Sequence, residues 1–208
     1  DFCLSRGLGD VYKRQGLIPA IGDNFNKNSA EVGQGVTVFT LFFAISAPIF
    51  STLLAKNEVK NILILAISVF SLANLITALA PNYAIYIISR AIAGLGAGIF
   101  SPIAVSSSSH LVSKKHKGKA IAFTVGGMSV GTVVGVPLGL EVSKYTNWRF
   151  SILIIVLIGL IGLMSILKYL PRFKVQAPPN LKSRFKLFLD KHVSVSYTHL
   201  RAHETGRN

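Results

Sequence analysis

The sequence contains a single cysteine, Cys3, among its 208 residues. One thiol cannot form a disulfide within the chain, and it cannot supply the paired cysteine ligands of a structural metal site. His199 and His203 stand at helical spacing, but both lie in a terminal segment that we expect to be non-native. The sequence therefore predicts neither a disulfide framework nor a metal site.

Acidic residues are also scarce, with 8 Asp and Glu against 22 Lys and Arg and a formal net charge of +14. A nucleic-acid-binding domain would carry such charge on a mostly polar surface with interleaved aromatic residues. Here half of the residues are hydrophobic, and the cations stand in short loops between long apolar runs. Loops of this kind are typical of the cytoplasmic side of a membrane protein. The lipid bilayer is therefore the predicted partner, and nucleic acid is not.

The two ends of the chain are expected to be foreign to the protein. Residues 5–15 read SRGLGDVYKRQ and residues 195–204 read VSYTHLRAHE. Both strings can be translated from one DNA segment read on opposite strands, and that segment resembles a transposon-type sequencing adapter. We therefore expect residues 1–15 and 195–208 to be adapter read-through and the true N-terminus to be missing, so both ends are left out of the fold prediction.

Between these ends, apolar runs long enough to cross a bilayer alternate with short polar turns. A helix needs roughly 20 residues to cross the hydrocarbon core. The end of one span at 16–25 and a polar loop at 26–31 precede five complete spans, at 33–55, 62–80, 83–112, 120–142 and 150–170. Strands of a membrane barrel would be about ten residues long with alternating polarity. The predicted fold is an all-α membrane domain of six transmembrane helices over residues 16–170, with the first helix truncated.

Loop charge predicts the orientation of these spans. The turn at 56–61, the tetralysine loop at 113–119 and the tail after residue 171 are basic, and they alternate with nearly neutral loops. Basic loops stay in the cytoplasm. We expect a multi-pass protein of the cell (inner) membrane whose basic loops and C-terminal tail are cytoplasmic, with residues 171–194 as a cytoplasmic linker.

One span carries a glycine at every fourth position, and its members are Gly127, Gly131, Gly135 and Gly139, with Pro137 among them. Residues four apart share one helix face, so these glycines leave a groove that another helix can approach closely. The proline removes a backbone donor and bends the helix. The pattern predicts helices that slide or rock, as in a transporter, while simple close packing remains the alternative.

An arginine stands inside another apolar run. Arg90 shares a helix face with Gly94 and Gly98. A membrane arginine usually faces a wet cavity or a carboxylate, although Arg90 could also extend to the interface near Asn82. The glycines also approach a dinucleotide-binding pattern, but the last glycine and the strand–turn context are absent, so no cofactor is predicted. Arg90 is the candidate transport residue.

Residues 16–170 resemble the N-terminal six-helix half of a major facilitator superfamily transporter, most closely the arabinose-efflux and drug:proton antiporter branch. That family's fourth-helix motif, for which a role in proton transfer is proposed, is matched by Arg90, Gly94, Gly96 and Gly98. Residues 131–139 are similar to the antiporter motif of the fifth helix. Val136 separates glycine from Pro137, whereas many members have them adjacent, so the register of the bend differs.

The family usually carries a gating motif between the second and third helices. The matching residues 51–63 read STLLAKNEVKNIL, with Ala55 in the place of the usual Asp and Glu58 in the place of the second glycine. Lys56 and Lys60 keep the basic character, and the positive-inside rule explains them equally well. The gating loop is therefore degenerate.

The resemblance implies two six-helix halves that rock about a midplane cavity, with the C-terminal half missing from this chain. It implies proton-coupled efflux of a small molecule, either a drug-like compound or a sugar, with no enzymatic activity. Within the complete spans the only carboxylate is Glu141, near the outer end of its helix. In related transporters the coupling acid is often on the first helix. An uptake symporter of the same superfamily and a non-transporting membrane assembly protein remain as alternatives.

Overall fold

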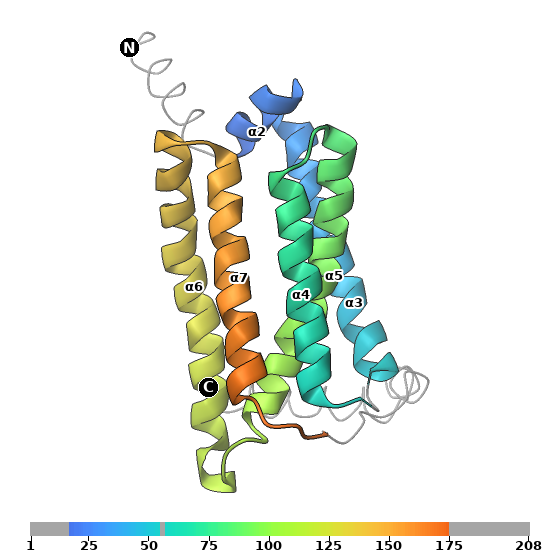
Figure 1. The fold of residues 1–208 in the computed structure, drawn as a ribbon, viewed down its shortest axis with the longest axis vertical. Helices are drawn as coiled ribbons and strands as arrows, with labels where there is room; N and C mark the ends of the chain where they lie inside the picture. Colours follow the sequence, from blue (N-terminus) through green and yellow to red (C-terminus); the bar gives the residue numbers. More distant parts are fainter. Residues whose placement is uncertain (1–16, 55–56, 175–208) are drawn as a thin grey trace, which may run out of the picture.

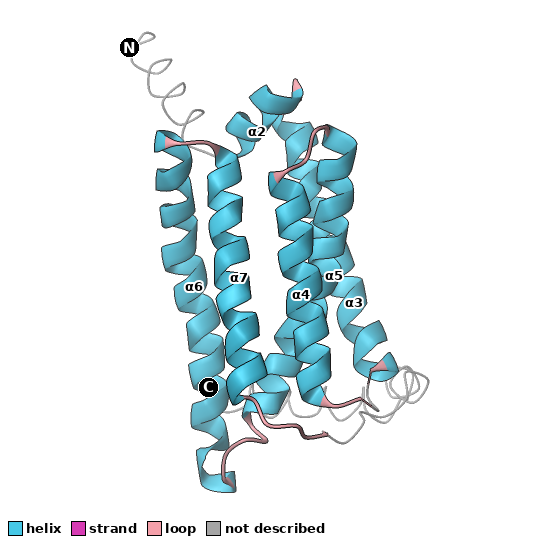
Figure 2. Ribbon diagram, in the orientation of Figure 1, coloured by secondary structure: helices cyan, strands magenta, loops and turns pink. Residues whose placement is uncertain are grey.

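The structure is a computed structural model, and it describes residues 17–54 and 57–174. Within these two ranges the regular structure consists of helices alone (Figure 2). The helices are α2 (Leu17–Phe25), α3 (Ser29–Leu53), α4 (Val59–Ala78), α5 (Tyr83–Ser108), the short 3-10 helix η1 (Lys114–His116), α6 (Lys117–Tyr145) and α7 (Trp148–Tyr169). The predicted all-α fold is confirmed.

The five long helices stand side by side in a bundle, and short α2 lies across one end of it (Figure 1). The most extensive interfaces are those of α5 with α3 and α4, and that of α4 with α7. In contrast, α6 contacts α7 and α5 only sparsely and lies at the edge of the bundle. The arrangement places α3, α4 and α5 as one tightly packed group that holds the candidate site.

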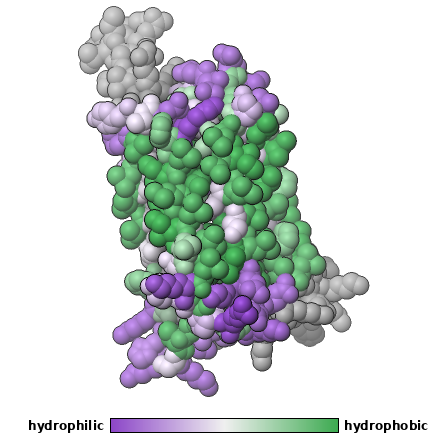
Figure 3. Space-filling model, in the orientation of Figure 1, coloured by the Kyte–Doolittle hydropathy of each residue, from purple (hydrophilic) through white to green (hydrophobic). Residues whose placement is uncertain are grey.

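Five helices of the described ranges, α3 to α7, are long and apolar enough to cross a membrane. The face of the molecule shown in Figure 3 carries a hydrophobic band between polar ends. Large apolar side chains are exposed on the long helices, and Phe123 on α6 is 86% exposed. A contiguous apolar surface of this kind fits the hydrocarbon region of a bilayer.

Four helices begin earlier than the sequence predicts: α3 at Ser29, α4 at Val59, α6 at Lys117 and α7 at Trp148. The expected loop at 26–31 is wrong in its second half, since α3 already begins at Ser29. The Asn28 Oδ1 accepts a hydrogen bond from the Glu31 N–H at 2.8 Å, while Glu31 accepts one from the Asn28 N–H at 2.9 Å. This reciprocal pair has the form of a capping box, and it satisfies donors at the helix start. Helix α6 likewise begins at Lys117, so its first turn includes basic loop residues.

Arginine also joins two helices at the end of the bundle near α2. The Arg149 side chain at the start of α7 donates to the carbonyl of Ala80 at 3.0 Å and lies over the Trp148 ring. It thereby binds a carbonyl just beyond the end of α4, where backbone acceptors lack helical partners. Trp148 itself is buried in an apolar cluster with Ile21 and Tyr86. These contacts fix α4 and α7 relative to α5.

Candidate functional site

Arg90 lies on α5, and its guanidinium points between the two helices packed against that face. The Arg90 Nη2 donates to the Asn74 Oδ1 on α4 at 2.6 Å, with Thr77 Oγ1 farther away at 3.5 Å. The guanidinium carbon lies 5.7 Å from the centre of the Phe39 ring on α3, which is cation–π distance. The side chain is therefore held inside the α3–α4–α5 group.

The groups around Arg90 are polar but uncharged. Asn74, Thr77 and Ser89 are each 1% exposed. The Thr77 and Ser89 hydroxyl oxygens lie 2.8 Å apart, and both also contact backbone carbonyls of their own helices. The Arg90 Nε is buried, and within the described ranges it has no hydrogen-bond partner. The arginine thus carries its charge among neutral acceptors that satisfy only part of its donor set.

The carboxylates of the described ranges all lie toward helix ends. Asp23 is near the end of α2, Glu31 near the start of α3, Glu58 just before α4 and Glu141 near the end of α6. The ion pairs Lys27–Glu31 and Arg172–Glu58 do not include Arg90. The same ranges hold no cluster of three or more metal-ligating side chains. A partly buried cation without a nearby anion is costly.

Three glycines of α5 bring its backbone against its neighbours. A Cβ placed on Gly94 would overlap the Phe39 carbonyl, and one on Gly98 would overlap Phe43 and Ser46, all on α3. A Cβ on Gly96 would lie 2.8 Å from the Phe70 backbone nitrogen on α4. Close helix contact through small residues is typical of membrane bundles. It also brings Phe39 of α3 and Asn74 of α4 close to Arg90.

The glycine stripe of α6 has a different environment. No described atom outside the helix itself lies within 4 Å of a Cβ placed on Gly127, Gly131, Gly135 or Gly139. The helix continues through Pro137 as far as Tyr145. The Ser151 hydroxyl on α7 donates to the Gly139 carbonyl at 2.7 Å. The side of α6 on which the glycine side-chain positions lie thus has no neighbouring helix in the described structure. The backbone of α6 contacts α7 through the Gly139 carbonyl.

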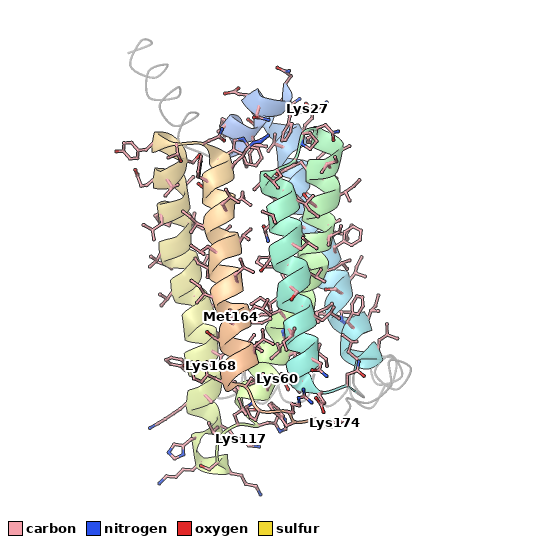
Figure 4. All side chains as sticks on the ribbon, viewed as in Figure 1. Lys27, Lys60, Lys117, Met164, Lys168 and Lys174 are labelled. Carbon is pink, nitrogen blue, oxygen red and sulfur yellow. The ribbon has the colours of Figure 1, made fainter. Side chains whose placement is uncertain are left out.

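Of the three gating-loop residues, Lys56 lies outside the described ranges, while Glu58 and Lys60 both contact the end of α7 or the residues after it. The Lys60 Nζ donates to the Leu167 carbonyl at 2.8 Å, and Glu58 lies 3.9 Å from the Arg172 Nε. The Val59 N–H also donates to the Phe173 carbonyl at 3.0 Å. Lys60 stands with Lys117, Lys168 and Lys174 at one end of the bundle, opposite Lys27 (Figure 4). The loop joins α4 to the segment that follows α7.

Sequence reasoning missed Asn74 and the contacts of Lys60 with α7. A signal for Asn74 was present, because Ser71, Asn74 and Thr77 are polar residues at intervals of three within an apolar run. Such spacing places them on one helix face. The partner of Lys60 is 107 residues away in the chain, and local sequence carries no signal for that contact.

Comparison with known proteins gives consistent matches over most of the chain. A family model described as the Major Facilitator Superfamily matches residues 15–202. The uncharacterized MFS-type transporter YfhI of Bacillus subtilis (strain 168) is 30% identical over 186 residues, which are 89% of this chain and 47% of that protein. The inner membrane transport protein YdhP of Escherichia coli (strain K12) is 24% identical over 184 residues, which are 88% of this chain and 47% of that protein. The chain thus spans about half the length of the curated relatives it matches.

Proposed function

Because this chain belongs to the Major Facilitator Superfamily, we propose that its whole protein exports a small molecule across the inner membrane in exchange for protons. The chain corresponds to the N-terminal half of such a transporter, which works by alternating access. The observation that carries the proposal is the charge of Arg90, held inside a membrane bundle by neutral groups.

Arg90 supplies the electrostatic part of the proposed exchange. An acid that releases its proton beside a buried cation leaves a carboxylate that the cation stabilises. Protonation of that acid removes its attraction to Arg90. In the proposed exchange the proton and the substrate compete for the same site. We place the coupling acid on the first membrane helix, before the described ranges. The transported compound is drug-like or a sugar.

The packing supports a division between a rigid and a mobile part. Helices α3 and α4 both pack closely on α5 at Gly94, Gly96 and Gly98, so the three helices move as one body in the proposed cycle. Helix α6 packs sparsely and carries the open glycine face and Pro137. In the proposed transporter this face slides against helices of the C-terminal half.

The distribution of lysines supports the proposed orientation. Lys60, Lys117, Lys168 and Lys174 gather at one end of the bundle, which we assign to the cytoplasm (Figure 4). Residues 171–194 then form a cytoplasmic linker between the two halves. Residues 1–15 and 195–208 are proposed to be adapter read-through.

The test is an efflux assay on the full-length protein in an efflux-deficient bacterial strain, with ethidium and L-arabinose as probes. Arg90→Ala and Gly135→Leu are expected to lower probe efflux to the level of empty vector while the protein remains in the membrane. The 208-residue chain alone is expected to give no efflux above vector. Wild-type efflux by both variants would contradict the proposal.

A further inference from the structure

The neighbour of Arg90 on α4 has a feature that general packing does not explain. Asn74 is an amide in an apolar membrane helix, it is 1% exposed, and both ends of its side chain are hydrogen-bonded. Burying an amide in an apolar environment is costly unless its donors and acceptor have partners. Its position therefore depends on the contacts that it makes.

Those contacts fix the direction of the amide. The Asn74 Nδ2 donates to the Phe70 carbonyl on its own helix at 2.8 Å. This leaves Oδ1 directed at Arg90, whose Nη2 donates to it at 2.6 Å. The reverse orientation would place the NH₂ group against a guanidinium, donor against donor, and would leave the Phe70 carbonyl without this bond. The amide is thus an acceptor aimed at Arg90.

The acceptor is neutral, and this property separates it from the usual partner of a buried arginine. A carboxylate at the same place would accept the same hydrogen bond and would also cancel the charge. An amide holds the guanidinium without cancelling it. The Arg90 Nε donates to no group in residues 17–54 and 57–174, so it remains for an anion.

We infer that Asn74 is a positioning residue for Arg90, and that its neutral amide keeps the arginine's charge available to the anionic group that the transport cycle brings to it. The inference rests on the transport role proposed for Arg90. It predicts that removal of the amide and its replacement by a carboxylate have different effects on transport.

Other groups that could influence the pH dependence are few in the described parts of α3, α4 and α5. Tyr86 lies one turn before Arg90 on α5, interacts electrostatically with it, and has its hydroxyl against Gly35 of α3. Glu31 and Tyr83 stand near the helix ends closest to α2, and Lys60 stands at the start of α4. Tyr86→Phe therefore belongs in the same experiment as a control for the pH profile.

The test of function measures the pH dependence of ethidium and L-arabinose transport by the full-length protein in vesicles. Asn74→Leu is expected to lower the rate about ten-fold, because a hydrogen bond to a charged group is lost, with the pH profile kept. Asn74→Asp is expected to abolish the wild-type pH profile, because the new carboxylate neutralises Arg90. Ser71→Ala, one turn away on α4 and without a hydrogen-bond partner in the described ranges, is the matched control.

A second measurement does not depend on transport. The apparent melting temperature in detergent is compared for Asn74→Leu, Arg90→Met and the double variant. Asn74→Leu is expected to lower it in the wild-type background and to have little further effect beside Arg90→Met, since coupled residues are non-additive. Additive effects, or an Asn74→Asp variant with the wild-type pH profile, would overturn the inference. Absence of proton-driven transport by the wild type would instead reject the proposed function, and the melting comparison would still decide the coupling.

Discussion

The ammonium of Lys60 at the start of α4 donates a hydrogen bond to the carbonyl of Leu167 near the end of α7, across 2.8 Å. The last carbonyls of a helix have no partner within the helix, and a cation near them also interacts favourably with the helix dipole. The Val59 N–H binds the Phe173 carbonyl just beyond, so two bonds tie the same two segments. A residue expected only to be basic or gating thus has a defined structural contact.

Replacing this lysine tests that contact. Lys60→Met in the full-length protein is expected to lower the apparent melting temperature by about 2 °C, because a partly exposed charged hydrogen bond contributes on the order of 1 kcal/mol. Amide exchange at residues 169 and 170 is expected to rise. Lys168→Met is the control, since Lys168 lies over the neighbouring Tyr169 ring. Equal amide exchange in the two variants would contradict a structural role for the bond between Lys60 and the Leu167 carbonyl.

The glycines of α5 give a sharper prediction. Gly98→Ala is expected to destabilise the protein by about 1–3 kcal/mol, because its Cβ would overlap the backbone of Phe43 and the Ser46 side chain. Gly33→Ala on α3 is the matched control, since no described atom outside its own helix would lie within 4 Å of that Cβ. Thermal unfolding in detergent measures both variants. A Gly98→Ala protein as stable as the control would show that α3 and α5 do not pack this closely.

The interface of α4 and α7 permits a compensation experiment. A Cβ on Gly159 would overlap the Ser71 hydroxyl, while it would lie 3.5 Å from the Ser71 Cβ, which is ordinary contact. Gly159→Ala is therefore expected to lower the melting temperature, and adding Ser71→Ala is expected to restore most of the loss. Ser71→Ala alone should be near neutral, because its hydroxyl oxygen is buried without a partner in the described ranges. A double variant no more stable than Gly159→Ala would contradict the packing.

The sequence predicted the membrane spans because each apolar run exceeds the length that a bilayer requires, and the five long helices confirm this. The resemblance that rests on Arg90 and its glycines is confirmed at the level of the family. The start of α3 was missed because the cap depends on Asn28 and Glu31, two polar residues that also suit a loop. Polar runs at helix ends are ambiguous for this reason.

Contacts between helices could not be predicted in the same way. Helical spacing places Gly94 and Gly98 on one face, but it does not say that the face meets α3. It also did not say that the stripe from Gly127 to Gly139 would be open in the described structure. Which faces meet depends on the packing of the whole bundle, and a single sequence without covariation carries little information about it.

In the proposed mechanism the charge of Arg90 couples proton movement to transport. The most direct measurement is substrate-driven proton flux in vesicles that contain the full-length protein, followed with a pH-sensitive dye while ethidium or L-arabinose is added. The account predicts proton flux with the wild type, none with Arg90→Ala, and partial flux with Arg90→Lys, which keeps the charge but not the fixed donor geometry. Equal proton flux in the wild type and Arg90→Ala would contradict it.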